Sequence, residues 1–306
     1  RARRIDDAIG QYAVFLKEQF PKKLRLEGIR IVIDCANGAS YKVAPKVFEE
    51  LGAEVFCIGV QPNGLNINLN CGALHPEDMQ NKVRLYKADI GFAFDGDADR
   101  IIACDAQGNL LDGDEYLAIV GCHMLQNKQL AKNTVVSTVM SNMGLETTLK
   151  KYGGKLVRAA VGDRYVYKEM TDNGYNLGGE QSGHIIFSDF STTGDGILAG
   201  LQLLKVVSSE QKTLGELRTI IKKLPQITKS FEVERKIPIE KLPNLKVCLN
   251  NVEKQLGNSG RVLFRYSGTE KKARIMVEGQ ELGLISQIVD ELKKETIRSI
   301  NSYEEK

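Results

Sequence analysis

This sequence lacks a strong excess of one charge, paired cysteines and long apolar runs. Its 306 residues carry 42 Lys and Arg against 39 Asp and Glu, a balance too even to favour nucleic acid or a membrane surface as partner. The six cysteines form no C-x-x-C pair and no disulfide-framework spacing. No apolar stretch reaches the roughly 18 residues of a membrane span, and no signal peptide is visible. We therefore expect a cytoplasmic protein with reduced thiols.

The chain has the length and the apolar content to build real cores. Hydrophobic residues make up 42% and charged residues 26% of the chain, as is ordinary for a globular protein. Strand-like and helix-like segments alternate over residues 1–225, which predicts α/β units with largely parallel sheets. Strands dominate after Pro225, which predicts an α+β unit. We thus expect two mixed α/β domains (1–112 and 113–225) and a smaller α+β C-terminal domain (226–306).

Two helix predictions are specific enough for the structure to test. The apolar spacing predicts one continuous helix over residues 214–224, ending at Pro225. In the C-terminal domain, a short helix is expected over residues 252–256 and a longer one over residues 284–300. The chain also begins at Arg1, inside what is predicted to be a helix ending at Pro21.

Three aspartates follow the predicted strand at residues 90–94. Asp95, Asp97 and Asp99 alternate with small residues, so a curled backbone would turn all three carboxylates to one side. Such carboxylates repel one another unless a cation lies between them, and Mg²⁺ takes oxygen ligands and holds phosphate beside them. Arg100 adds a planar fork suited to a phosphate dianion. The motif predicts a site for one Mg²⁺ ion.

A solvated turn and a calcium-binding loop are weaker interpretations of these aspartates. A solvated turn is ordinary for a single Asp after a strand, but three Asp and an Arg within six residues favour a metal site. A calcium EF-hand loop also begins Asp-x-Asp-x-Asp, but it needs Gly next and Glu at its twelfth position. Those positions hold Arg100 and Ala106, so the EF-hand is excluded.

Three further loops carry residue types that bind anions or sugars. Small hydroxyl residues around a Gly, with Arg on both arms, suit a phosphate, although a plain hairpin turn has the same pattern. Glu and Ser two apart on an extended segment would point the same way, toward sugar hydroxyls, and a nearby His is either a proton carrier or a structural residue. A helix start with an Asp N-cap and an Arg suits an anion or is a simple cap. The loop suited to phosphate comprises Arg265, Ser267, Gly268, Thr269 and Arg274. The loop suited to sugar hydroxyls comprises Glu180, Ser182 and His184, and the helix start comprises Asp163 and Arg164.

The four loops together resemble the α-D-phosphohexomutase superfamily. The matching motifs are Asp-Gly-Asp-Ala-Asp-Arg (95–100), Gly-Asp-Arg-Tyr-Val (162–166), Gly-Gly-Glu-Gln-Ser-Gly-His (178–184) and Arg-x-Ser-Gly-Thr-Glu (265–270). Segments 64–68, 71–72 and 75–77 narrow the resemblance to the bacterial phosphoglucosamine mutase family. The resemblance covers essentially the whole chain. It implies a phosphohexomutase-type fold of four domains, three α/β and one smaller α+β, around a central cleft.

The resemblance also implies an activity. Members of that family are isomerases that interconvert glucosamine 6-phosphate and glucosamine 1-phosphate, on the route to UDP-N-acetylglucosamine and peptidoglycan. They use Mg²⁺, a phosphorylated serine and a glucosamine 1,6-bisphosphate intermediate. A small phosphosugar would then be the partner, with neither nucleic acid nor membrane involved, and a homodimer is the assembly that we consider.

Residue by residue, the resemblance assigns roles to the motif positions. Asp95, Asp97 and Asp99 resemble the metal ligands, and Arg100 and His184 resemble catalytic residues, His184 as one that helps to move protons. Sugar-hydroxyl contacts are implied for Glu180 and Ser182. The grip on the phosphate that is not transferred is implied for Arg265, Ser267, Gly268, Thr269 and Arg274. Asp163 and Arg164 match a loop that faces the substrate.

The sequence departs from the family pattern in two ways. Tyr266 and Lys271 stand in or beside the phosphate loop where the family tends to have other residues. The family's first domain, with its catalytic serine in a Ser-His-Asn-Pro-like segment, has no match, so we expect this chain to be inactive alone.

Three further functions are compatible with the sequence. They are a phosphomannomutase or phosphoglucomutase on the same scaffold, an aspartyl-phosphate phosphatase, and a non-catalytic fragment that binds sugar phosphates.

Overall fold

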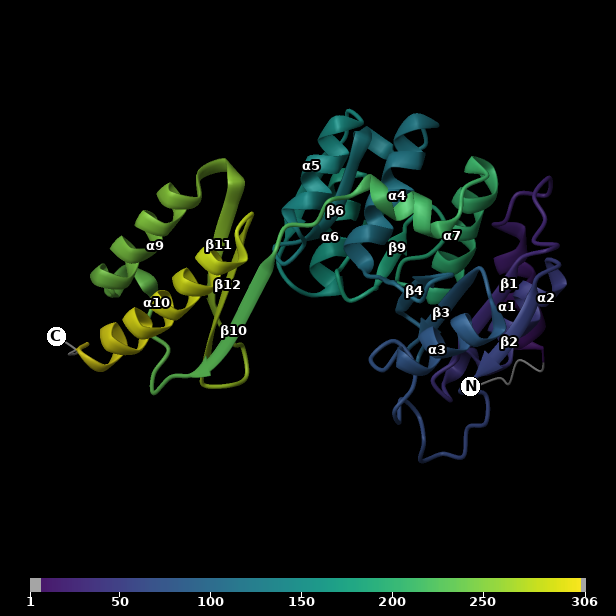
Figure 1. Ribbon diagram of the computed structural model, residues 1–306, viewed down its shortest axis with the longest axis horizontal. Helices are drawn as coiled ribbons and strands as arrows, with labels where there is room; N and C mark the ends of the chain where they lie inside the picture. Colours follow the sequence, from purple (N-terminus) through teal and green to yellow (C-terminus); the bar gives the residue numbers. More distant parts are fainter. Residues whose placement is uncertain (1–6, 304–306) are drawn as a thin grey trace, which may run out of the picture. The chain divides into compact units, whose positions relative to one another are not determined.

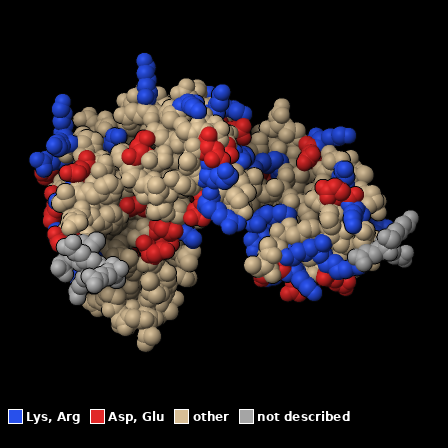
Figure 2. Space-filling model, turned by 180° about the vertical axis from the view of Figure 1, so that it is seen from behind, with Lys and Arg blue, Asp and Glu red and all other residues tan. Residues whose placement is uncertain are grey.

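The computed structural model describes residues 7–303, and the chain divides into two compact units (Figure 1). Unit 1 comprises Arg1–Ser141 and Leu145–Lys222, and unit 2 comprises Asn142–Gly144 and Lys223–Lys306. No helix within the described range is both long and apolar enough to cross a membrane. Figure 2 shows broad uncharged areas on unit 1 and a denser distribution of Lys and Arg on unit 2.

The first sheet of unit 1 is mostly parallel and places the aspartate loop at the end of a buried strand. Its order is β2-β1-β3-β4-β5. The strands β1, β2 and β3 run parallel, whereas β4 and β5 return antiparallel. Every residue of β3 is buried. The strands are β1 (Arg30–Asp34), β2 (Glu54–Ile58), β3 (Ile90–Phe94), β4 (Ile101–Asp105) and β5 (Leu110–Leu111), and the helices of this part are α1 (Ala8–Glu18), α2 (Val43–Glu50) and α3 (Glu77–Tyr86).

The second sheet of unit 1 has the order β7-β6-β8-β9. Here β6, β7 and β8 are parallel, and β9 pairs antiparallel with β8. Because β8 and β9 form a hairpin, the residues between them make a tight turn. The strands are β6 (Thr134–Thr138), β7 (Lys155–Ala159), β8 (Leu177–Gly179) and β9 (Ile185–Phe187), and the helices are α4 (Gly113–Gln126), α5 (Met143–Lys151), α6 (Asp163–Asn173), α7 (Gly196–Glu210) and α8 (Leu214–Leu217).

The helices α4 and α7 join both sheets in one core. Each is apolar on most of its surface and buried along most of its length, which is expected of a helix that is covered on all sides. A capping box between Asp112 and Glu115 begins α4, and the Asp195 side chain caps α7 by accepting the Leu198 N–H. The start of α7 is thereby fixed next to the aspartate loop.

Unit 2 has an antiparallel sheet of order β10-β12-β11 and a core of its own. The helix α10 packs on β10 and β12, while α9 packs on β11 and α10. The elements are β10 (Gln226–Glu232), α9 (Pro243–Leu256), β11 (Gly260–Tyr266), β12 (Lys272–Gly279) and α10 (Leu282–Asn301). This is the α+β arrangement that the sequence predicts, after two α/β sheets as expected. The domain boundaries at 112/113 and 225/226 stay predictions.

The two specific helix predictions are wrong in extent. The helix expected over 214–224 ends at Leu217 and continues only as a 3₁₀ turn, Arg218–Ile220. The helix expected over 252–256 is far longer, because α9 begins at Pro243. Proline is favoured in the first helical turn, where its missing N–H costs nothing, and the buried Leu245, Val252 and Leu256 give this helix its inner face.

Candidate functional site

The three aspartates converge in the turn that follows β3. Asp95, Asp97 and Asp99 can each offer a carboxylate oxygen such that these oxygens all lie within 4.8 Å of one another. Ala98 has a φ of 63°, and its N–H donates to the Asp95 carbonyl oxygen at 3.0 Å. This left-handed residue curls the backbone, so the alternating side chains meet on one side of the turn. Asp95 is 9% exposed, whereas Asp97 is exposed.

The charges in this turn are not balanced by the protein alone. Burial, the hydrogen bond with Asp99 and the Asp99 and Asp97 charges together raise the pKa of Asp95 to about 6, although the Arg100 backbone N–H opposes this shift. Arg100 offsets part of this charge, because its Nε lies 3.6 Å from both Asp95 Oδ2 and Asp99 Oδ1. Among the described residues, Asp99 Oδ1 has no hydrogen-bond partner although it is buried. An oxygen-rich, crowded and unsatisfied set of this kind fits a hard divalent cation.

Backbone contacts from two other segments fix the aspartate turn. The Ala39 N–H donates to the Gly96 carbonyl oxygen at 2.8 Å, and the Gly196 N–H donates to the Ala98 carbonyl oxygen at 2.8 Å. A Cβ on Gly38 would lie 2.2 Å from the Gly96 oxygen. The turn is therefore held by the loop after β1 and by the first residue of α7, and Gly38 is needed for the close approach.

His184 is 3% exposed and uses both of its ring nitrogens. Its Nδ1 lies 3.1 Å from Asp99 Oδ2, and its Nε2 lies 3.1 Å from the Gly194 backbone nitrogen. A backbone N–H can only donate, so Nε2 accepts and the proton sits on Nδ1, from which it is donated to Asp99. A Cβ on Gly194 would lie 2.6 Å from Nε2. This geometry makes His184 a support of the Asp99 carboxylate.

Glu180 and Ser182 lie in the turn between β8 and β9. The expectation that they alternate on an extended segment is wrong, because the hairpin closes here with the Gly183 N–H donating to the Glu180 carbonyl oxygen at 3.0 Å. Glu180 Oε1 accepts the Gly162 N–H at 3.0 Å. Ser182 is exposed. The hairpin turn thus reaches both the start of α6, through Glu180, and the aspartate turn, through His184.

The start of α6 differs from the sequence expectation in its cap. Asp163 was expected as the N-cap, but it is the first helical residue, and Gly162 is the N-cap with a φ of 125°. Only Gly adopts that conformation readily. Arg164 is exposed, lies over the Tyr165 ring at 4.5 Å and donates to the Tyr165 hydroxyl at 2.6 Å. Both Asp163 and Arg164 stay candidates for facing an anion.

The second group of candidate residues lies in unit 2, where β11 turns into β12. Arg265 and Arg274 are paired directly across these strands. Burial lowers the pKa of Arg265, and the neighbouring Arg274 charge lowers it further. Arg274 Nε is buried without a hydrogen-bond partner in the part of the chain that the structure describes. Two guanidinium groups this close favour an anion between or beside them.

The turn that joins these strands is more open. Ser267 is 6% exposed, whereas Gly268 and Thr269 are exposed. Lys236 Nζ donates to the Ser267 carbonyl oxygen at 2.6 Å and to the Gly268 carbonyl oxygen at 3.1 Å. Because the lysine ties down both carbonyls, the shape of the turn depends on it. Lys236 was not predicted from the sequence, because it lies about thirty positions before the turn that it contacts and no neighbouring residue marks it.

The sequence of this chain is similar to curated proteins and family models along nearly its whole length. Models described as phosphoglucomutase/phosphomannomutase alpha/beta/alpha domain II, alpha/beta/alpha domain III and C-terminal domain match residues 10–108, 112–224 and 206–295. The phosphoglucosamine mutase of Pelobacter propionicus is 53% identical over 298 residues, which are 96% of this chain and 66% of that protein. That of Desulfotalea psychrophila is 53% identical over 302 residues, 99% of this chain and 67% of that protein. The chain thus spans about two thirds of the length of these relatives.

Solved structures share the fold. A phosphoglucomutase/phosphomannomutase family protein from Burkholderia thailandensis has a TM-score of 0.80 at 20% identity, covering 97% of this chain and 66% of its own. The Aspergillus fumigatus N-acetylphosphoglucosamine mutase, solved with GlcNAc-6P and magnesium, has a TM-score of 0.74 at 19% identity, covering 94% of this chain and 69% of its own. At such identities the likeness shows the fold alone.

Proposed function

Because this chain belongs to the phosphoglucomutase/phosphomannomutase family, we propose that it carries the metal-binding, sugar-binding and phosphate-binding loops of a phosphoglucosamine mutase. The reaction is the interconversion of glucosamine 6-phosphate and glucosamine 1-phosphate, an isomerisation by phosphoryl transfer through a 1,6-bisphosphate. The observation that carries the proposal is the convergence of Asp95, Asp97 and Asp99 beside Arg100. Relatives at about 53% identity favour glucosamine phosphate as the sugar.

Each loop has a task that its chemistry suits. Asp95, Asp97 and Asp99 would hold Mg²⁺, which when bound neutralises charge on the phosphoryl group in transfer. Arg100 would donate to the same phosphoryl oxygens. Glu180 and Ser182 would contact sugar hydroxyls, and Asp163 and Arg164 would face the substrate. Phosphoryl transfer needs positioning more than covalent help, and these fixed loops provide it.

The phosphate that stays on the sugar would be held in unit 2. Arg265 and Arg274 supply the charge, and the turn with Ser267, Gly268 and Thr269 supplies N–H and O–H donors. Glucosamine 1,6-bisphosphate would act as intermediate and activator, because each of its phosphates can occupy this loop in turn. Because two Arg residues supply the positive charge of this loop, it would suit a phosphate dianion.

We assign His184 a positioning role in this reaction. A proton carrier needs one ring nitrogen free for the substrate, but Nε2 is engaged by Gly194 and Nδ1 by Asp99. The ring therefore orients the Asp99 carboxylate toward the metal position, in the way that outer residues commonly fix metal ligands. Replacing His184 by Asn would keep an N–H donor near the Nδ1 position, whereas Ala would remove it, so Asn should retain more Mg²⁺ affinity than Ala.

The test compares residues 1–306 alone with a chimera in which they replace the matching 66% of the Pelobacter propionicus relative. A coupled assay with glucosamine 6-phosphate and a 1,6-bisphosphate activator should show turnover for the chimera and none for residues 1–306. Mannose and glucose phosphates run in parallel should be poorer substrates. A phosphate stably attached to a serine of residues 1–306, seen by intact mass, would contradict the assignment of these loops to binding.

A further inference from the structure

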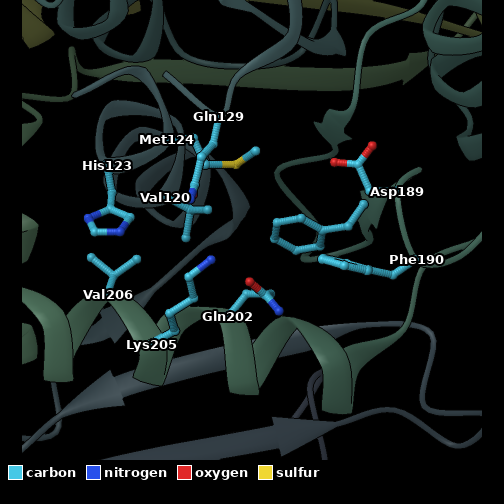
Figure 3. A pocket seen from close by; sticks show the side chains of 10 residues that line it. Val120, His123, Met124, Gln129, Asp189, Phe190, Gln202, Lys205 and Val206 are labelled. Atoms are coloured by element: carbon cyan, nitrogen blue, oxygen red, sulfur yellow. The ribbon is translucent and has the colours of Figure 1, made fainter. Parts of the chain in front are cut away.

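A separate cavity of about 290 Å³ lies in unit 1 between α4, α7 and the residues that follow β9 (Figure 3). Its apolar wall includes Val120 and Met124 from α4, Val206 from α7, and the rings of Phe187 and Phe190, whose centroids are 6.3 Å apart. None of the residues assigned above to metal, sugar or phosphate lines it. Its walls and volume suit a ligand with a compact apolar body.

Lys205 is the basic group of this cavity that could attract an anion. It extends from α7 toward Val120 of α4 (Figure 3). Burial lowers the pKa of its amine, and no carboxylate within the described residues offsets that effect. Lys205 is partly buried, and an ammonium group that loses part of its water without gaining an anion is disfavoured, so an anion that enters the cavity would gain a favourable electrostatic contact.

Three of the four other polar side chains of the wall already have partners, and the fourth is the exposed Gln129. His123 Nδ1 lies 3.0 Å from Glu210 Oε1, Asp189 Oδ2 accepts from Asn176 at 2.7 Å, and Gln202 donates to the Gln19 carbonyl oxygen at 3.3 Å. Figure 3 shows the Asp189 carboxylate on a different side of the cavity from the Lys205 amine. One available cation and a nearby carboxylate favour a single negative charge and disfavour a phosphate dianion.

We propose that this cavity binds a small organic monoanion, a carboxylate on an apolar body about the size of one ring, with the carboxylate against Lys205 and the body between α4 and the two phenylalanines. The site is independent of the proposed mutase reaction. Its ligand differs in chemistry from a phosphosugar, which needs several hydroxyl partners and a dianion grip that this wall does not offer.

The test uses benzoate as probe and the methyl resonance of Met124 in the methyl-¹³C-methionine chain as readout. Benzoate should shift this resonance saturably, while benzamide (the same ring without charge), acetate (the charge without a ring) and inorganic phosphate should bind at least about tenfold more weakly, as expected for the loss of a charged contact. Lys205→Met should weaken benzoate about tenfold and leave benzamide unchanged. The exposed Lys254→Met on α9 is the control and should change neither.

Lys205→Met should fold, because it removes a partly buried charge and keeps the length of the side chain; its melting temperature without probe should equal or exceed that of the parent chain. If this variant does not fold, Phe190→Ala tests the apolar wall in the same way and should weaken benzoate and benzamide together. The proposal is overturned if benzoate leaves the Met124 resonance unmoved, if Lys205→Met binds benzoate as tightly as the parent, or if phosphate competes with benzoate at equal concentration.

Discussion

Two turns gather charges of one sign but are held in different ways. They are the aspartate turn of unit 1 (residues 95–100) and the proposed phosphate turn of unit 2 (residues 267–269, between Arg265 and Arg274). Around the aspartates, backbone groups of two other segments donate to the Gly96 and Ala98 carbonyls, and close packing leaves no room for a side chain on Gly38. Around Ser267 and Gly268, the backbone bond from the Ser267 N–H to the Lys272 carbonyl oxygen stays within the hairpin, and the contact from another segment to the Ser267 and Gly268 carbonyls is one lysine side chain. A Cβ on Gly268 would meet nothing within 4 Å.

This difference suits the metal-binding and phosphate-binding tasks that we propose for the two turns. A metal site needs its ligands held within fractions of an ångström, and packed backbone provides that precision. A phosphate grip that must accept either end of a bisphosphate tolerates a looser, charge-held turn, because guanidinium groups act over a longer range than metal ligands. The following predictions are ordered from the largest expected effect to the smallest, and each changes one side of this comparison.

Matched glycine substitutions in the two turns should differ most. In Gly38→Ala the new Cβ would meet the Gly96 oxygen at 2.2 Å, and backbone on both sides must move, so we expect a loss of about 3 kcal/mol or more in the free energy of unfolding. Gly268→Ala, at a turn position with open space, should stay within about 0.5 kcal/mol. Denaturant unfolding of both variants measures this, and equal losses would remove the distinction between packed and open turns.

Asp97→Asn should weaken Mg²⁺ binding while the fold stays intact. Even residues that only support metal ligands cost tenfold to a hundredfold in affinity when they are changed, so loss of a ligand should cost at least about a hundredfold, or 2.8 kcal/mol. Without metal, the melting temperature should stay equal or rise, because one of three repelling carboxylates is neutralised. Calorimetry with Asp172→Asn as control measures this, and unchanged affinity would show that Asp97 is not a ligand.

Arg265→Ala should weaken binding of both glucosamine 1-phosphate and glucosamine 6-phosphate. Removing a charged donor to a phosphate costs on the order of 1.5–3 kcal/mol, and each phosphate would occupy this loop in one half of the reaction. Titration of the chain with each sugar phosphate measures this, with the exposed Lys271→Ala as control. A variant that is impaired with only one of the two phosphates would rule out a shared loop.

Local sequence was sufficient for the parts of these sites that lie within one segment. The run of Asp95, Asp97 and Asp99 after an apolar strand predicted a cation site, and the structure brings these carboxylates together. The α/β and α+β units were likewise predicted from alternating patterns. In each case the deciding residues lie a few positions apart, where spacing and chain geometry determine proximity.

The contacts between distant segments could not be predicted from the sequence. Gly38 next to Gly96, and Gly194 next to His184, are close only because the chain folds back. His184 was expected to help to move protons, whereas its two hydrogen bonds favour a positioning role, and nothing around it in sequence indicates either partner. Lys236 is about thirty positions from the turn that it holds. The turn at Glu180 was mistaken for an extended segment, although the Ser182-Gly183 pair is a turn signal and Gly183 has a φ of 90°.

Lys236→Met should loosen the phosphate turn while leaving Arg265 and Arg274 unchanged. Loss of the bonds to the Ser267 and Gly268 carbonyls frees the backbone, so we expect about a threefold weaker affinity for sugar phosphate, roughly 0.7 kcal/mol. Lys236→Arg should recover most of this, since it can donate to the same carbonyls. If the Met and Arg variants bind sugar phosphate equally well, the hydrogen bonds from Lys236 to the two carbonyls do not determine the affinity of the turn.

The smallest effect concerns Asp195, which caps α7 beside the aspartate turn. Burial raises the pKa of this carboxyl, although its hydrogen bonds from Leu198 and Tyr12 oppose the shift. The folded chain therefore holds a proton that the unfolded chain releases, and this group's contribution to stability is complete below the ordinary Asp pKa and declines as pH rises through the raised one. Asp195→Asn keeps a capping oxygen for Leu198 but cannot ionise. We expect its free energy of unfolding to lie within about 1 kcal/mol of the parent at neutral pH, with a flatter decline from pH 4 upward. Parallel denaturant titrations across pH check this, and identical pH profiles for the two proteins would show that Asp195 titrates normally in the folded chain.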